Sequence, residues 1–165
     1  MIFLTVGTLF PFDRLVEGVD EVLDKDGSDE RVVAQVGNTS YHPRNLEASA
    51  SLEATVFDKH LREADRIISH AGMGTIAMAL EYKKPLLVMP RMRRYREHVN
   101  DHQVATAKRF EELGCLLVAY DAEQLPEKME ALKSFTPRNR QAQIEAVVDR
   151  IASFLSELAS GGKYG

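Results

Sequence analysis

Cysteine is almost missing from this chain, because Cys115 is the one cysteine among 165 residues. No disulfide can therefore form within the chain, and a reducing, cytosolic compartment is the simplest interpretation. Lone cysteines are among the most often buried residues, and Cys115 stands directly before an apolar run at 116–118. We therefore expect Cys115 to pack in the core.

An excess of positive charge is also missing, since 21 Lys and Arg face 25 Asp and Glu, for a formal net charge of -4. This balance disfavours a nucleic-acid binder that depends on an overall basic surface, and we expect no nucleic-acid partner. No stretch approaches the roughly 20 apolar residues of a membrane span. The apolar N-terminus lacks the basic region and cleavage site of a signal peptide. We expect any membrane contact to go through another molecule.

The residue patterns of several common sites are absent as well. The five histidines show no zinc-type spacing with cysteine or carboxylates, so we predict no metal site. There is no nucleophile elbow and no P-loop lysine motif. The segment at Gly7 lacks the further glycines of a dinucleotide fingerprint, which disfavours a nicotinamide enzyme.

What is present is a regular alternation of strand-like and helix-like segments in a chain with 44% hydrophobic and 28% charged residues, typical of a soluble globular domain. Continuous apolar runs predict strands at 2–6, 32–36, 66–69, 85–89 and 116–119. Apolar residues at helical spacing predict helices at 12–23, 57–63, 74–82, 99–113, 125–132 and 144–158, and the polar segment 37–53 reads mostly as loop. We predict one α/β domain over 1–160, a Rossmann-like parallel sheet with helices on both faces, and a frayed tail at 161–165.

The most informative segment directly follows the strand at 66–69. It runs through His70, Gly72, Met73, Gly74 and Thr75 into a helix. The two glycines allow a ligand to approach the backbone, and the free amides and positive dipole of a helix start suit a phosphate. Alternatively, the glycines serve a tight turn that binds nothing.

A second glycine turn, Gly7 and Thr8, follows the first predicted strand. Ligands of parallel sheets bind at the carboxyl ends of the strands, so this turn could offer an amide and a hydroxyl to the same ligand. An ordinary strand-to-helix loop is the other interpretation.

Four arginines follow the strand at 85–89 within six positions, namely Arg91, Arg93, Arg94 and Arg96. Arginine binds phosphate and carboxylate through two parallel hydrogen bonds, so an anionic ligand would explain the cluster. A solvated loop, or a patch that faces an acidic partner or anionic lipid, would explain it equally well.

Several polar side chains begin the helix that follows, and Asn100, Asp101 and Gln103 are the candidates among them. Amides and carboxylates at a helix start can hydrogen-bond the hydroxyls of a sugar. Helix capping accounts for one such residue, but not for several polar groups in a row.

These segments together resemble the C-terminal, donor-binding half of family 28 glycosyltransferases. The matching text is FLTVGT, VVAQVGNTSY, ADRIISHAGMGTIAMALEYKKPLLVMPR and EHVNDHQ, in this order along the first two-thirds of the chain. Within the family, the chain is most similar to the small PssE-type subunits of bacterial exopolysaccharide glycosyltransferases. It is also similar to the small subunit of the eukaryotic two-chain enzyme that adds the second N-acetylglucosamine to dolichol.

The resemblance implies one half of a GT-B fold that holds a UDP-sugar and transfers the sugar with inversion, without a metal ion or other cofactor. It implies that Gln35 and Gly37 approach the nucleotide, and that Asn100, Asp101 and Gln103 reach the sugar hydroxyls. Met73 and Arg91 complete the donor-binding candidates. The residues that the resemblance places near the diphosphate are Gly7, Thr8, Gly72, Gly74 and Thr75.

The chain departs from the family pattern in two respects. Many members carry a glutamate, which holds the ribose, where this chain has Met78, and the nearest carboxylate, Glu81, lies about one helical turn further on. The fold that the resemblance implies also needs a second domain, which in these relatives comes from a separate membrane-anchored chain. The residues identify no general base: His70 and His98 are candidates by residue type alone.

We therefore expect a cytoplasmic donor-binding subunit, held at the inner face of the membrane by an anchored, acceptor-binding partner. Its acceptor would be a lipid-linked saccharide in polysaccharide biosynthesis, and its donor a UDP-hexose or UDP-hexuronic acid. Two alternatives remain: a non-catalytic interaction or regulatory module of the same fold, and one half of an enzyme that epimerises UDP-sugars.

Overall fold

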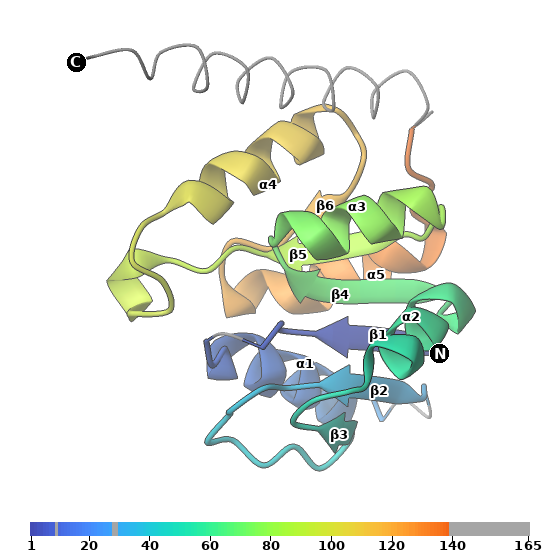
Figure 1. The fold of residues 1–165 in the computed structure, drawn as a ribbon, viewed down its shortest axis with the longest axis vertical. Helices are drawn as coiled ribbons and strands as arrows, with labels where there is room; N and C mark the ends of the chain where they lie inside the picture. Colours follow the sequence, from blue (N-terminus) through green and yellow to red (C-terminus); the bar gives the residue numbers. More distant parts are fainter. Residues whose placement is uncertain (9, 28–29, 139–165) are drawn as a thin grey trace, which may run out of the picture.

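Six parallel strands form one sheet in the order β3-β2-β1-β4-β5-β6 (Figure 1). The computed structural model describes residues 1–8, 10–27 and 30–138. The strands are β1 (Ile2–Thr5), β2 (Val32–Gln35), β3 (Glu47–Ser49), β4 (Arg66–His70), β5 (Leu86–Met89) and β6 (Leu117–Val118).

Helices cover both faces of this sheet. One face packs on α1 (Asp13–Asp26) and α5 (Leu125–Ser134). The opposite face packs on α2 (Ala54–Glu63), α3 (Met73–Glu81) and α4 (His102–Glu112). Short 3-10 turns, η1 (Arg93–Tyr95) and η2 (Ala122–Gln124), precede α4 and α5. The predicted Rossmann-like α/β class, with helices on both faces of a parallel sheet, is confirmed.

The inner strands β1, β2, β4 and β5 are mostly apolar on both sides because each side meets a helical layer. Leu4 belongs to the cluster of α1 and α5, whereas its neighbour Phe3 belongs to the cluster of α2, α3 and α4. Ile68 and Ile67 of β4 divide in the same way. A strand buried on both faces has no room for alternating polar residues, which explains the continuous apolar runs in the sequence. Cys115 is buried, as expected.

The structure refines one sequence expectation and corrects another. Residues 37–53 are mostly loop, as expected, but Glu47–Ser49 within them form the edge strand β3, parallel to β2. Val99 does not lie on the apolar face of α4: it precedes the helix and is 73% exposed. The predicted helix at 144–158 and the tail at 161–165 lie outside the described residues.

Within the described ranges, no helix is long and apolar enough to cross a membrane. In that same part of the chain, no three His, Cys, Asp or Glu side chains come together as metal ligands would.

Candidate functional site

The strand order places the two glycine turns at one point of the sheet. From β1 the chain moves outward to β2 and β3, and from β4 it moves in the other direction to β5 and β6. In such sheets, ligands bind outside the carboxyl ends of the two strands where the direction reverses. Thr5 at the end of β1 pairs with Ser69 of β4, so the turns that follow, at Gly7 and Gly72, share this position. The structure thus brings the two predicted segments together.

His70 lies between these turns. A Cβ atom on Gly7 would stand 3.0 Å from Cε1 of His70, and one on Gly72 would stand 2.2 Å from its Nε2. The absence of side chains at the two glycines therefore allows the imidazole to fit. Burial lowers the pKa of His70 to about 4, and the nearby charge of Arg91 acts in the same direction. His70 is neutral at pH 7.

The first turn of α3 presents backbone amides without acceptors. Gly72 precedes the helix and makes no side-chain cap, and the first helical hydrogen bond runs from Ile76 N to Gly72 O at 3.1 Å. No described residue accepts a hydrogen bond from the amides of Met73, Gly74 or Thr75. These amides and the helix dipole form an arrangement that binds anions such as phosphate.

The surroundings of these amides differ from residue to residue. Gly74 is exposed, and a Cβ atom added to it would meet no other atom within 4 Å. Met73 is 40% exposed, whereas the side chain of Thr75 is largely buried. The open side of the turn therefore lies at Met73 and Gly74.

The turn after β1 is held by a short chain of polar contacts. Gly7 adopts a positive φ of 74° and donates its amide to Oγ1 of Thr5 at 3.3 Å. The same hydroxyl donates to Oε1 of Gln35 at 2.7 Å. Gly37 packs so close that a Cβ atom would stand 3.2 Å from the Gly7 carbonyl oxygen. Gly7, Gln35 and Gly37 thus form one packed unit, with Thr8 exposed beyond it.

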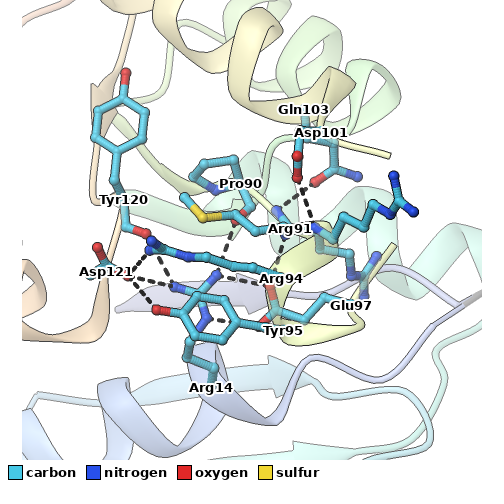
Figure 2. A network of polar contacts seen from close by, with 12 residues as sticks. Arg14, Pro90, Arg91, Arg94, Tyr95, Glu97, Asp101, Gln103, Tyr120 and Asp121 are labelled. Atoms are coloured by element: carbon cyan, nitrogen blue, oxygen red, sulfur yellow. Dashed lines mark hydrogen bonds and ion pairs between the residues drawn. The ribbon is translucent and has the colours of Figure 1, made fainter. Parts of the chain in front are cut away.

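The predicted sugar-contacting residues lie at the start of α4, and two of them hold the segment that follows β5 (Figure 2). Oε1 of Gln103 accepts a hydrogen bond from the backbone amide of Arg91 at 3.1 Å. Oδ1 of Asp101 accepts one from the backbone amide of Arg93 at 2.7 Å. The first bond fixes the orientation of the Gln103 amide, because only its oxygen can accept. Its nitrogen is then left as a donor. Asn100 accepts the amide of His102 at 3.3 Å.

The four arginines have different environments. Arg91 is buried, and its Nη2 donates to the carbonyl oxygens of Val6, at 2.8 Å, and Phe10. Burial lowers the pKa of Arg91 to about 10, which leaves the guanidinium charged at pH 7. Arg91 therefore stabilises the turn after β1 through hydrogen bonds to its backbone carbonyls.

The other three arginines are exposed. Arg94 pairs with Asp121 at 2.7 Å. The side chains of Arg93 and Arg96 have no polar partner among the described residues. These two remain available for an anionic ligand or surface.

The sequence interpretation missed the carboxylates that anchor the loop between β2 and β3. Asp20 of α1 is 3% exposed and accepts the amide of Asn45 at 2.8 Å and the hydroxyl of Tyr41 at 2.8 Å. Burial opposes its ionisation, but these hydrogen bonds outweigh burial and keep the pKa of Asp20 below its ordinary value. The available signal was a carboxylate on the buried face of α1, beside Val16 and Val19.

The glycosyltransferase family 28 C-terminal domain model matches residues 1–158. The chain belongs to this family. The mouse UDP-N-acetylglucosamine transferase subunit ALG13 is 34% identical to this chain over 124 residues, which cover 69% of this chain and 10% of that protein. The chain thus spans about a tenth of the curated relatives that it matches.

Solved structures share the fold. The glycotransferase of kitacinnamycin superposes with a TM-score of 0.62 at 22% identity, over 98% of this chain and 40% of that chain. The solution structure of ALG13 gives a TM-score of 0.58 at 22% identity, over 82% of this chain and 87% of that chain. At this identity the likeness concerns the fold alone, which is one half of the GT-B fold.

At position 78, where the resemblance leads us to expect a glutamate, this chain has no carboxylate. Met78 is partly buried and packs against the core cluster of α2, α3 and α4. Glu81 is exposed at the last position of α3. The side chain at 78 therefore contributes to packing.

Proposed function

We propose that this chain is the donor-binding subunit of an inverting glycosyltransferase that moves a hexosyl or hexuronosyl group from a UDP-sugar to a lipid-linked saccharide in exopolysaccharide biosynthesis. One observation carries the proposal. In a family 28 domain, the amides of Met73, Gly74 and Thr75 lack acceptors among the described residues and lie at the reversal point of the strand order. A diphosphate supplies the charge and the acceptor atoms that these amides lack.

The amides would act on the leaving group. In an inverting transfer, a hydroxyl oxygen of the acceptor bonds to the anomeric carbon from the face opposite UDP, and the bond from that carbon to the β-phosphate oxygen breaks. The electron pair of the broken bond stays on UDP. Amides and a helix dipole aimed at that phosphate stabilise the new charge without a metal ion, so we propose transfer without a metal cofactor.

The proton of the acceptor hydroxyl needs a base, and neither candidate histidine fits that role well. His70 lies beneath the two glycine turns, and its pKa of about 4 is too low for efficient proton abstraction at neutral pH. The ring of His98 packs on Phe10, with 5.4 Å between the centroids, and on His102 at 4.6 Å. We therefore assign the base to the acceptor-binding partner chain.

Exposed apolar side chains support a partner at the same edge of the sheet. Among the described residues, four of the five exposed large hydrophobic side chains follow the carboxyl ends of β1, β4 or β5: Phe10, Met73, Tyr95 and Val99. Apolar residues gathered around a polar site are typical of a surface that another protein covers. We propose that a membrane-anchored, acceptor-binding chain covers this edge and holds the subunit at the cytoplasmic face of the membrane.

Calorimetric titration with UDP, UDP-glucose, UDP-N-acetylglucosamine and UDP-glucuronic acid tests donor binding. The proposal expects saturable binding of UDP by the chain or by its complex with the partner. Release of UDP that depends on a lipid-linked acceptor would support transfer. Absence of saturable UDP binding in both forms would refute the proposal.

One observation favours the non-catalytic alternative, namely the packed Met78 at the position of the ribose-binding glutamate. A regulatory module would form the complex with the partner, but neither the chain nor the complex would bind UDP in the same titrations. The epimerase alternative predicts interconversion of UDP-sugars in the absence of an acceptor, which proton NMR of the reaction mixture would detect.

A further inference from the structure

Three consecutive backbone amides after β5 are each held by a side chain from further along the chain (Figure 2). The amide of Met92 donates to Oε2 of Glu97 at 2.9 Å. The amides on either side of Met92 donate to Gln103 and Asp101, as described above. Glu97 is therefore the central member of the set that shapes this loop.

Glu97 is in turn held by Arg14 of α1, which is 83 positions away in the sequence. The guanidinium forms two parallel hydrogen bonds, from Nε to Oε1 at 2.7 Å and from Nη2 to Oε2 at 2.9 Å. Nη2 also donates to the Pro90 carbonyl at 3.1 Å, and Nη1 donates to the Tyr120 carbonyl at 3.2 Å. Arg14 thus joins α1 to the start of the loop, to Glu97 within it and to the segment that follows β6.

The burial of this pair makes it different from the surface pairs of the molecule. The side chains of Arg14 and Glu97 are 15% and 9% exposed. Arg31 and Glu47 form a pair of the same geometry, at 2.7 and 2.8 Å, but these side chains are 61% and 58% exposed. Breaking a buried charged pair leaves one charge uncompensated and is costly, whereas exposed pairs contribute about 1 kcal/mol or less.

We propose that Arg14 and Glu97 are positioning residues for the sugar part of the donor. The pair fixes residues 90–101, and with them Asp101 and the donor nitrogen of Gln103, relative to the diphosphate turn at α3. Neither Arg14 nor Glu97 is assigned a contact with the ligand. This inference rests on the proposed function, because it needs a UDP-sugar at this edge of the sheet.

The inference predicts that loss of the pair changes the affinities for UDP and for the UDP-sugar to different extents. Glu97→Gln keeps an oxygen for Met92 but removes the charge that pairs with Arg14. UDP binds at the α3 turn, so its affinity should stay within about twofold, whereas the affinity for the preferred UDP-sugar should fall about tenfold because its sugar contacts are misplaced. Glu47→Gln is the matched control, since it removes the exposed Arg31–Glu47 pair, which lies at the amino-terminal ends of the strands and therefore opposite the site.

Calorimetry of wild type, Glu97→Gln and Glu47→Gln against UDP and the UDP-sugars tests whether the pair positions the sugar contacts. Amide hydrogen exchange tests, without a ligand, whether the pair orders the loop. We expect faster exchange in the peptide that spans residues 90–101 for Glu97→Gln and unchanged exchange for Glu47→Gln. Arg14→Lys, which keeps the charge but loses the two parallel bonds, should show the same pattern and replaces Glu97→Gln if that variant does not fold.

The outcomes separate the two claims. If wild type binds neither UDP nor any UDP-sugar, the proposed function fails, and the exchange data still decide whether the pair orders the loop. If wild type prefers a UDP-sugar and Glu97→Gln keeps that preference, the positioning role is refuted. Equal losses for UDP and UDP-sugar would also refute it, since they would indicate a general structural role.

Discussion

The imidazole of His70 occupies the space that a side chain at Gly72 would need. A Cβ atom at position 72 would stand 2.2 Å from Nε2 of His70, well inside contact distance. At Gly74, two residues further on, an added Cβ would meet nothing within 4 Å. The two glycines of the same turn thus serve different purposes: the first accommodates the protein's own histidine, and the second leaves open space.

This difference predicts opposite effects for two alanine variants. Gly72→Ala should lower the midpoint of urea unfolding, because the methyl group and the ring cannot both keep their places. Gly74→Ala should fold at least as well as wild type, since alanine favours a helix by up to about 1 kcal/mol over glycine. If UDP lies against the turn, Gly74→Ala should nevertheless weaken UDP binding about tenfold or more. Normal UDP binding by Gly74→Ala would contradict the phosphate assignment.

His70 should make the fold sensitive to acid. Its pKa is lowered from 6.5 to about 4 in the folded chain, so the unfolded chain takes up a proton first as the pH falls. The contribution of His70 to stability is complete above about pH 6.5 and is lost progressively down to pH 4. This shift corresponds to a decrease of about 3 kcal/mol in the free energy of unfolding.

Urea unfolding of wild type and His70→Asn between pH 4 and 7 measures this contribution. The variant should show a shallower fall in stability over that range. The matched control, His42→Asn, removes an exposed histidine and should retain the slope of wild type. Parallel curves for wild type and His70→Asn would mean that the imidazole is not buried in its neutral form.

Arg91 should matter for stability, because its guanidinium supplies the donors for two carbonyls of the β1–α1 connection, those of Val6 and Phe10. Arg91→Met keeps much of the apolar stem and removes these donors. We expect a loss of about 2–4 kcal/mol in the free energy of unfolding, measured in urea. Arg96→Met, at an exposed position of the same loop, should change stability by less than about 0.5 kcal/mol. Equal stability of the two variants would refute the supporting role of Arg91.

Gln103 should contribute to the choice of sugar through its nitrogen. Its oxygen is occupied by the Arg91 amide, so the side chain offers a ligand donors only. Gln103→Glu keeps an oxygen for Arg91 but replaces the donor with a second acceptor. We expect the ratio of UDP-sugar to UDP affinity to fall about tenfold, while UDP itself binds within about threefold of wild type. An unchanged ratio would exclude a sugar contact at this position.

The strands of the site could be predicted from the sequence because each is a buried apolar run that ends near a glycine or proline, as at Gly7, Gly37 and Pro90. Strand β3 could not, because its residues Glu47–Ser49 are all exposed. Strand β3 is defined by its backbone pairing with β2, and such pairing produces no hydrophobic pattern in the sequence.

The contacts that shape the loops were also beyond sequence reasoning. Arg14 and Glu97 lie 83 positions apart, and no spacing rule connects them. The arginine cluster gave no sign that Arg91 points inward while Arg93 and Arg96 stay exposed. Asp101 and Gln103 were recognised as polar groups at a helix start, but their bonds to the backbone of residues 91–93 depend on how the loop folds back.

The most direct test of the account is an NMR titration of nitrogen-15-labelled protein with UDP, with uridine as the control that lacks phosphate. We expect saturable shifts of the Met73, Gly74 and Thr75 amides with UDP and much smaller shifts with uridine, because the phosphates occupy those amides. If these three resonances stay in place while UDP is added to saturating concentration, or if UDP and uridine shift them equally, the α3 turn does not hold the diphosphate.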